Sequence, residues 1–206
     1  IDGNRDKLKV TVVGAAVYVS DSATVNIYDG IRIADHKKLG NERILGCENF
    51  ASLAAIERAG GAALIIVNGR VNMYGGVIEN NAVLTEYTTG TDANGNAISK
   101  EDAACGGAIY NHGNFHMYGG IIRGNEALRG GMIYNDRYLL LESGTVADNF
   151  AHTYGGAISS SGAAESIMYI GHEGSGNKMT IDNNRSNKAG GAIYSNTNSP
   201  IVIYGN

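Results

Sequence analysis

One short motif recurs through the second half of the chain and limits the folds that are available to it. Gly-Gly-Ala-Ile, or a close variant, begins at Gly106, Gly130, Gly155 and Gly190. Successive copies are therefore 24, 25 and 35 residues apart. Internal periods of about 20 to 50 residues are typical of repeat architectures, in which each unit buries its apolar face against its neighbours. We therefore interpret the chain as a stack of similar units.

A second repeated element lies between the glycine motifs. It reads FHMYGGIIRGN over residues 115–125 and VNMYGGVIENN over residues 71–81. One unit of about 24 residues then holds three short runs in which apolar residues alternate with others. Alternation with a period of two predicts strands rather than helices. In the clearest copy the runs cover residues 108–111, 115–118 and 121–123.

Three strands and three bends per unit predict a parallel β-helix. Each strand would pair with its equivalent about 4.8 Å away in the next coil. A leucine-rich repeat has a similar period, but its L-x-x-L-x-L pattern is absent from the chain. We expect an all-β fold with five to six three-stranded coils of about 24 residues each. They would form a single domain over residues 1–206, as a segment of a longer chain.

The alternation assigns apolar residues to interior stacks. The first strand of each coil contributes Val17, Ile65, Ile109, Ile133, Ile158 and Ile193. The second and third strands contribute the pairs Val71–Met73, Phe115–Met117 and Leu139–Leu141, and then Ile78, Ile122, Val146 and Ile181. An asparagine recurs after the third strand as Asn81, Asn125, Asn149 and Asn184. Asparagine tolerates left-handed backbone angles and bonds nearby backbone groups, so we expect these residues to form a structural ladder.

Composition excludes several classes of protein and of partner. The 43% of hydrophobic residues and the net charge of −4 indicate a buried core rather than disorder. The negative charge argues against a nucleic-acid partner. No apolar run approaches the roughly 18 residues that a membrane-spanning helix needs, so we expect no membrane insertion of this segment. The five histidines lack metal-ligand spacing, and we expect neither a metal nor another cofactor.

Two adjacent insertions interrupt the repeat, at about residues 35–60 and 84–104. The first holds Phe50, Leu53 and Ile56 at a spacing that predicts one face of a helix. The second holds Tyr87 and an Asn-Gly pair between β-prone flanks, which predicts a hairpin turn. If this insertion binds a partner, we expect Tyr87 and the hairpin to be exposed. These segments either bind a partner or cover the apolar edge of the first coils. A disulfide between Cys47 and Cys105 is possible and would tie the insertions together.

Tyrosines recur at outward positions in two columns. One column holds Tyr28, Tyr74 and Tyr118 and is rejoined by Tyr204. The other column holds Tyr18, Tyr110, Tyr134 and Tyr194. Aromatic ladders pack well on a sheet face, and they can also form a platform for sugar rings or a protein partner. The candidate ligand-binding residues are Tyr28, Tyr74, Tyr118, Tyr110, Tyr134, Tyr194 and Tyr87.

The Gly-Gly-Ala-Ile copies resemble repeats in the polymorphic outer-membrane-protein passengers of autotransporters. More broadly, they are similar to bacterial surface proteins with right-handed parallel β-helix repeats. The resemblance covers about residues 14–206. It implies a right-handed coil, which is also the general preference of parallel crossovers. It further implies a secreted or cell-surface adhesin, and it supplies no catalytic residue.

Two functions are compatible with these sequence features. We favour a non-enzymatic, surface-exposed β-helix for adhesion or structural assembly, with a host or cell-surface protein or glycan as its partner. End-to-end association with further copies is also expected, because open coil ends present unpaired strand edges. The alternative is a polysaccharide lyase or glycoside hydrolase that acts on an outer face of the helix and needs clustered carboxylates. Glu79 and Arg123 are neighbours on that face, and we expect a surface ion pair between them.

Overall fold

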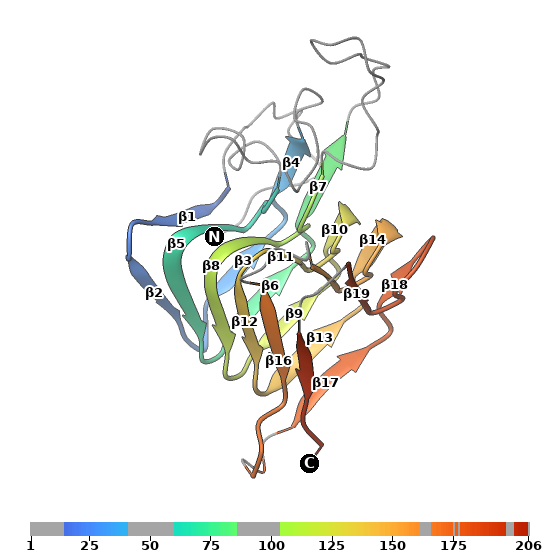
Figure 1. Cartoon of the computed structure of the whole chain (residues 1–206). Helices are drawn as coiled ribbons and strands as arrows, with labels where there is room; N and C mark the ends of the chain where they lie inside the picture. The colour runs from blue at the N-terminus through green and yellow to red at the C-terminus, as the bar shows by residue number, and fades with distance from the viewer. Residues whose placement is uncertain are drawn as a thin grey trace.

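The computed structural model describes residues 15–40, 60–85, 104–160, 166–174, 176, 178–196 and 200–205. These residues form strands and turns and contain no helix. The strands belong to three sheets, and all of their pairings are parallel (Figure 1). The all-β class and the parallel pairing predicted from the repeats are confirmed.

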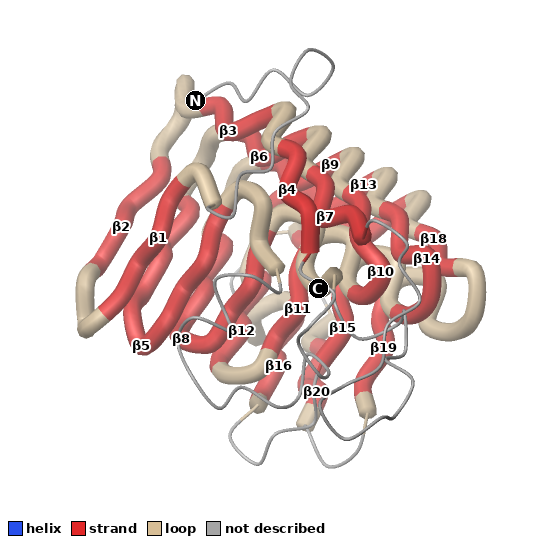
Figure 2. The backbone as a smooth tube through the Cα atoms, turned by 90° about the horizontal axis from the view of Figure 1, so that it is seen from above, coloured by secondary structure: helices blue, strands red, loops and turns tan. Residues whose placement is uncertain are grey.

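Sheet 1 is the largest, with ten strands. Its strands are β1 (Val17–Ser20), β2 (Thr24–Ile27), β5 (Leu64–Met73), β8 (Ile109–Met117), β11 (Ile133–Asn135), β12 (Tyr138–Leu141), β15 (Ile158–Ser160), β16 (Ile167–Ile170), β19 (Ile193–Ser195) and β20 (Ile201–Ile203). The long strands β5 and β8 pass through a bend in this sheet, whereas the other repeats divide the same path into two strands (Figure 2).

The other two sheets hold five strands each. Sheet 2 consists of β3 (Arg32–Ala34), β6 (Val77–Glu79), β9 (Ile121–Arg123), β13 (Gly144–Ala147) and β17 (Met179–Asp182). Sheet 3 consists of β4 (Lys37–Gly40), β7 (Ala82–Thr85), β10 (Glu126–Arg129), β14 (Phe150–Tyr154) and β18 (Arg185–Ser186). The chain visits sheets 1, 2 and 3 in turn, and we call one such passage a coil. Equivalent strands of successive coils lie side by side in rows (Figure 2).

Sheet 3 was not predicted. In the clearest copy the first two expected runs form the single strand β8, and the third run forms β9. The prediction did not assign the stretch Glu126–Arg129 to a strand. Glu, Ala and Arg have little intrinsic preference for strands, so this stretch carries no local signal. Its strand is held instead by neighbours, with Glu126 in register with Ala82 on one side and with Phe150 on the other.

The interior stacks are confirmed with one correction. Met117 lies in register with Met73 and Leu141, and Ile122 lies in register with Ile78 and Val146. Along the first strands the register is Val17, Leu64, Ile109, Ile133, Ile158 and Ile193. Leu64 therefore takes the interior position that was assigned to Ile65. A shift of one residue reverses the face of a strand, and Ile65 packs in a separate apolar cluster on the outer face.

The predicted asparagine ladder is confirmed. The Nδ2 of Asn81 donates to the Oδ1 of Asn125 at 3.0 Å, and Asn125 donates in the same way to Asn149 at 2.9 Å. Asn149 continues the ladder by donating to Asn184 at 2.9 Å. The same Oδ1 atoms also accept backbone N–H groups, for example that of Asn125. Asn81, Asn125 and Asn149 have no exposed surface, and their hydrogen bonds satisfy amide groups that would otherwise be costly to bury.

Glycine is required at the bend where the chain passes from sheet 3 back to sheet 1. The first glycine of each repeated pair has a positive φ, for example +63° at Gly130. A Cβ on Gly130 would lie 2.2 Å from the carbonyl oxygen of Ile133, which is far inside van der Waals contact. The glycine motif that reveals the repeat is therefore a requirement of the bend.

Candidate binding surface

Three tyrosines, two of them exposed and the third partly buried, stack on one another beside the bend between sheets 1 and 2. Tyr28, Tyr74 and Tyr118 directly follow β2, β5 and β8. The ring centroids of Tyr28 and Tyr74 are 5.3 Å apart and those of Tyr74 and Tyr118 are 5.1 Å apart, with interplanar angles of 12° and 11°. Tyr28 is 56% exposed and Tyr74 is 46% exposed. The column predicted from the sequence is therefore present, and two of its three tyrosines are exposed to solvent.

The backbone sets the spacing of this column. The N–H of Tyr74 donates to the carbonyl oxygen of Ile27, and the N–H of Tyr118 donates to that of Met73, both at 2.8 Å. The same ladder continues through Glu142 and Gly171 to Tyr204. Tyr204 thus returns to the column, as expected, but two residues without aromatic rings separate it from Tyr118.

Three further rings extend the tyrosine column across sheet 1. His116 lies 5.9 Å from Tyr118 and 5.1 Å from Tyr138, and Tyr138 lies 5.7 Å from Tyr169, all between ring centroids. We call the six residues the aromatic track: Tyr28, Tyr74, Tyr118, His116, Tyr138 and Tyr169. The repeat pattern did not identify His116, Tyr138 or Tyr169 as site residues. The alternation could have identified Tyr138, because Leu139 and Leu141 were assigned to the interior.

His116 joins the two halves of the track. Its Nδ1 forms a hydrogen bond of 3.1 Å with the hydroxyl of Tyr118. Burial lowers the pKa of His116 below its ordinary value of 6.5, and the nearby charge of Arg70 lowers it further. The imidazole is therefore neutral at pH 7. Burial also raises the pKa values of Tyr118 and Tyr138 above 10, so both phenols keep their protons at neutral pH.

Neutral polar groups flank the aromatic track. Asn26 and Asn72 lie in register on β2 and β5, next to the tyrosine column. The Nδ2 of Asn72 donates to the Oδ1 of Asn26 at 2.9 Å in an exposed pair. One half of sheet 1 consists of β2, the C-terminal parts of β5 and β8, and then β12, β16 and β20. Its outward positions form three columns, which begin at Thr24, Asn26 and Tyr28. In the described residues of these columns, Arg70 and Glu142 are the charged members.

The second tyrosine column differs from the prediction. Tyr110 and Tyr134 stack with their centroids 5.6 Å apart, but neither has any exposed surface. Both rings point away from the coil interior and pack in an outer apolar cluster with Ile65, Val67 and Cys105. Burial, together with the charge of Asp136, raises the pKa of Tyr110 well above 10. The expectation that these two tyrosines form an exposed platform is therefore wrong.

Tyr194 forms a different contact from the one that the column predicts. Ser159 separates it from Tyr134 in the register of sheet 1. Tyr154 stacks on Tyr194 instead, with ring centroids 4.6 Å apart. The guanidinium of Arg129 and the ammonium of Lys188 lie 5.3 and 5.6 Å from the centre of the Tyr154 ring. The Tyr154–Tyr194 stack connects β14 of sheet 3 to β19 of sheet 1, and the two cation–π contacts hold the Tyr154 ring from the side of sheet 3.

Glu79 is the centre of an ion-pair network on sheet 2. Its carboxylate accepts hydrogen bonds from the Nε of Arg32 at 2.6 Å and from the Nε of Arg123 at 2.8 Å. The pair with Arg123 was predicted, whereas Arg32 was missed. Hydrogen bonding to Arg32 is the largest cause that lowers the pKa of Glu79 below 4.5. Asp35 is a second carboxylate nearby, since it also contacts Arg32. Because Glu79 is ionised and held by two guanidinium groups, it is unsuited to donate a proton at neutral pH.

Two histidines outside the track, His112 and His152, have carboxylate partners. His112 contacts Asp136 through its Nδ1, and His152 contacts Glu126 through its Nε2 at 2.8 Å. No group of three or more metal-ligating side chains occurs among the residues that the structure describes. Within the same residues, no helix is long and apolar enough to span a bilayer.

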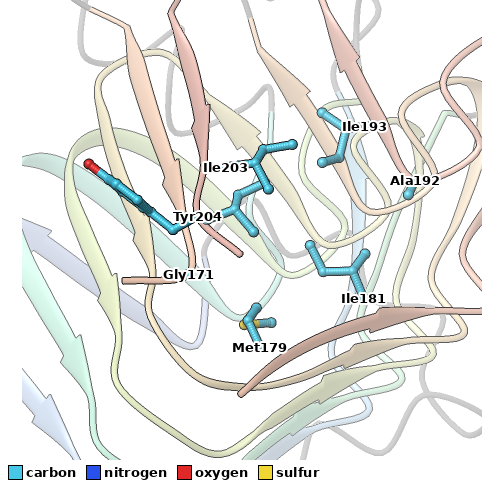
Figure 3. Close-up of a pocket in the computed structure, with 8 residues that line it drawn as sticks. Gly171, Met179, Ile181, Ala192, Ile193, Ile203 and Tyr204 are labelled. Atoms are coloured by element: carbon cyan, nitrogen blue, oxygen red, sulfur yellow. The ribbon is translucent and has the colours of Figure 1, made fainter. Parts of the chain in front are cut away.

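An apolar hollow of about 340 Å³ lies at the C-terminal end of the core. Met179, Ile181, Ile193 and Ile203 point into it from strands of sheets 1 and 2, whereas the ring of Tyr204 points away (Figure 3). Ile203 lies in register with the core residue Ile170 but is 66% exposed.

The two insertions fall largely outside the described residues. This applies to Phe50, Leu53, Ile56 and Tyr87, so the predicted helix, hairpin and binding role stay predictions. Cys105 is fully buried and is disulfide-bonded. Cys47 also lies outside the described residues, and its pairing with Cys105 stays a prediction.

One comparison with known proteins gives a match. Residues 178–196 match the model of the Chlamydia polymorphic membrane protein repeat. The matched segment includes β17, β18 and β19, and it contains the ladder residue Asn184 and the glycine pair Gly190–Gly191. No curated protein and no solved structure matches the chain. The match thus lies on residues that build the repeat and includes none of the six residues of the aromatic track.

Proposed function

We propose that the chain is part of a surface-exposed passenger of the autotransporter type, with the aromatic track as its adhesive face. Two observations support the surface location. The chain shares its repeat with polymorphic membrane proteins of Chlamydia over residues 178–196. Cys105 is disulfide-bonded, and disulfides persist mainly in oxidising environments outside the cytosol.

The scaffold that we propose is a right-handed parallel β-helix of five to six coils. Parallel pairing of equivalent strands in all three sheets supports the solenoid. The general preference of parallel crossovers supports its handedness. Such a scaffold fixes outward side chains at regular intervals, so one residue type per coil produces a continuous stripe on the surface.

The exposed tyrosine column is the observation that carries the adhesive role. Large aromatic side chains are enriched at the centres of binding interfaces, because they bury much surface and also form hydrogen bonds. Tyr28 and Tyr74 are about half exposed although they are held in a rigid stack. A rigid side chain loses little conformational entropy when it binds a partner.

Two experiments test the surface location and the adhesive role. Protease treatment of intact cells that make the native protein should cleave it if it is exposed on the surface. Purified chain should also bind to target cells or an extracellular matrix, and replacement of Tyr28, Tyr74 and Tyr118 by alanine should remove that binding. Tyr18→Ala is the matched control, because Tyr18 is also exposed, at 39%, but lies outside the track. Protection of the protein from protease in intact cells would contradict the surface location.

A further inference from the structure

We propose that the aromatic track binds a neutral, extended polysaccharide that lies across the ring edges, with about one sugar per coil. This inference rests on the proposed adhesive role and names the class of ligand. It follows from the orientation of the rings, the charge of the surrounding surface and the spacing of the coils.

The orientation of the rings excludes face-on stacking of a sugar on a tyrosine along most of the column. Tyr74 lies nearly parallel to both neighbours, so Tyr28 covers one of its faces and Tyr118 covers the other. The exposed part of Tyr74 is therefore its edge and its hydroxyl. A phenol hydroxyl can both donate and accept a hydrogen bond, and in this column the hydroxyl of Tyr118 already bonds His116.

The surroundings of the column favour a neutral ligand. The exposed amides of Asn26 and Asn72 lie beside it, and together they supply both donors and acceptors. His116 is neutral at pH 7, as its lowered pKa indicates. Arg70 and Glu142 carry opposite charges, so the described part of the three columns has no net charge. An anionic glycan would gain little from this surface, whereas a polyol could match its hydroxyl and amide groups.

The spacing favours an extended, β-1,4-linked chain. The tyrosine centroids advance by 5.3 and 5.1 Å along the axis of the stack. Sugars in an extended β-1,4-linked chain advance by close to one ring length each, in a nearly straight line. An α-1,4-linked glucan curves into a helix and would leave the column after a few contacts. A peptide would find no strand edge at Tyr74, because β5 is paired on both sides within the sheet.

Native gel electrophoresis with a soluble polysaccharide in the gel tests the inference. The probes are hydroxyethylcellulose as the neutral β-1,4-glucan, amylose as the α-1,4-glucan and dextran sulfate as the anionic control. We expect hydroxyethylcellulose to retard the chain, and amylose and dextran sulfate to leave its mobility unchanged. Equal retardation by amylose, retardation by dextran sulfate alone, or no retardation would each overturn the inference.

Tyr74→Phe distinguishes edge binding from face stacking. Loss of the hydroxyl should weaken the affinity for hydroxyethylcellulose roughly threefold to tenfold, because the ligand loses a hydrogen bond while the ring remains. A platform that stacks sugars on ring faces would tolerate this change and lose affinity only with Tyr74→Ala. Tyr18→Phe, with an unchanged affinity, is the matched control, and circular dichroism verifies the fold of each variant. Full affinity in Tyr74→Phe would overturn the edge-binding geometry.

The glycan inference and the adhesive role can fail separately. If the target surface still binds the chain through the three tyrosines after enzymatic removal of its glycans, the adhesive role stands and the glycan inference fails. If the tyrosine variants adhere as well as the wild type, the adhesive role itself fails.

Discussion

The side chain of Asn125 donates a hydrogen bond of 2.9 Å to Asn149 and accepts one of 3.0 Å from Asn81. The three amides belong to successive coils and are completely buried. Each asparagine therefore fixes the bend after sheet 2 in its own coil and also connects that bend to its neighbours. The ladder is the most direct link between the sequence repeat and the stacking of the coils.

Asn125→Ala should destabilise the fold by about 2–4 kcal/mol, because the backbone N–H and the Nδ2 group of Asn81 both lose their acceptor in a buried site. Denaturant unfolding followed by circular dichroism measures the change. Asn184→Ala is the matched control at the last described position of the ladder, where the side chain is partly exposed, and it should cost less. Equal losses for the two variants would show that burial does not determine the contribution of the ladder.

Gly130→Ala should be more destabilising than Gly174→Ala. Both glycines have positive φ values, +63° and +70°, so both substitutions strain the backbone. A Cβ on Gly130 also meets the carbonyl oxygen of Ile133, whereas a Cβ on Gly174 meets nothing within 4 Å. Gly174→Ala should therefore cost about 1–2 kcal/mol, and Gly130→Ala should cost more or prevent folding. Thermal unfolding compares the two, and an equal cost would show that the bend tolerates a side chain.

Glu79→Gln should destabilise the chain at pH 7 by on the order of 1 kcal/mol, since it removes the charge that pairs with Arg32 and Arg123. The pKa of Glu79 is lowered in the folded chain, so its contribution is present above its unfolded value of about 4.5. That contribution is lost as the pH falls through the lower, folded pKa. Urea unfolding at pH 7 and at pH 3 should therefore show a smaller difference between variant and wild type at pH 3. A difference that does not depend on pH would argue against the ion pairs as its cause.

Ile203→Glu should reduce self-association. Ile203 borders the apolar hollow and is already 66% exposed, so the charge should not disturb the fold of the single chain. We expect the wild type to form end-to-end oligomers at high concentration, because the hollow presents core side chains to solvent. Analytical ultracentrifugation measures the effect. A wild-type chain that stays monomeric at every concentration would contradict end-to-end association.

Much of the scaffold could be predicted from the sequence, because the repeat makes equivalent positions visible. Leu139 and Leu141 were assigned to the interior by alternation, and Asn125 was assigned to a ladder by its recurrence. The strand Glu126–Arg129 could not be predicted, since its residues form a strand only through pairing with neighbouring coils.

The candidate site could be predicted only in part, because the repeat pattern gives the direction of a side chain but not its surroundings. Alternation shows that a side chain points away from the coil interior, but it does not show whether anything packs over it. Tyr74 and Tyr110 both point outward, yet Tyr74 is 46% exposed and Tyr110 is buried in the cluster that contains Cys105. The second half of the track was missed because Tyr138 and Tyr169 occur in different columns and meet only diagonally.

The adhesive role of the aromatic track is tested most directly by the binding of purified chain to a target surface, with and without the tyrosine column. The variant in which Tyr28, Tyr74 and Tyr118 are alanine should keep the circular dichroism spectrum of the wild type, since Tyr28 and Tyr74 are about half exposed. We predict that this folded variant loses binding while Tyr18→Ala retains it. Undiminished binding by the folded triple variant would contradict the adhesive role of the track.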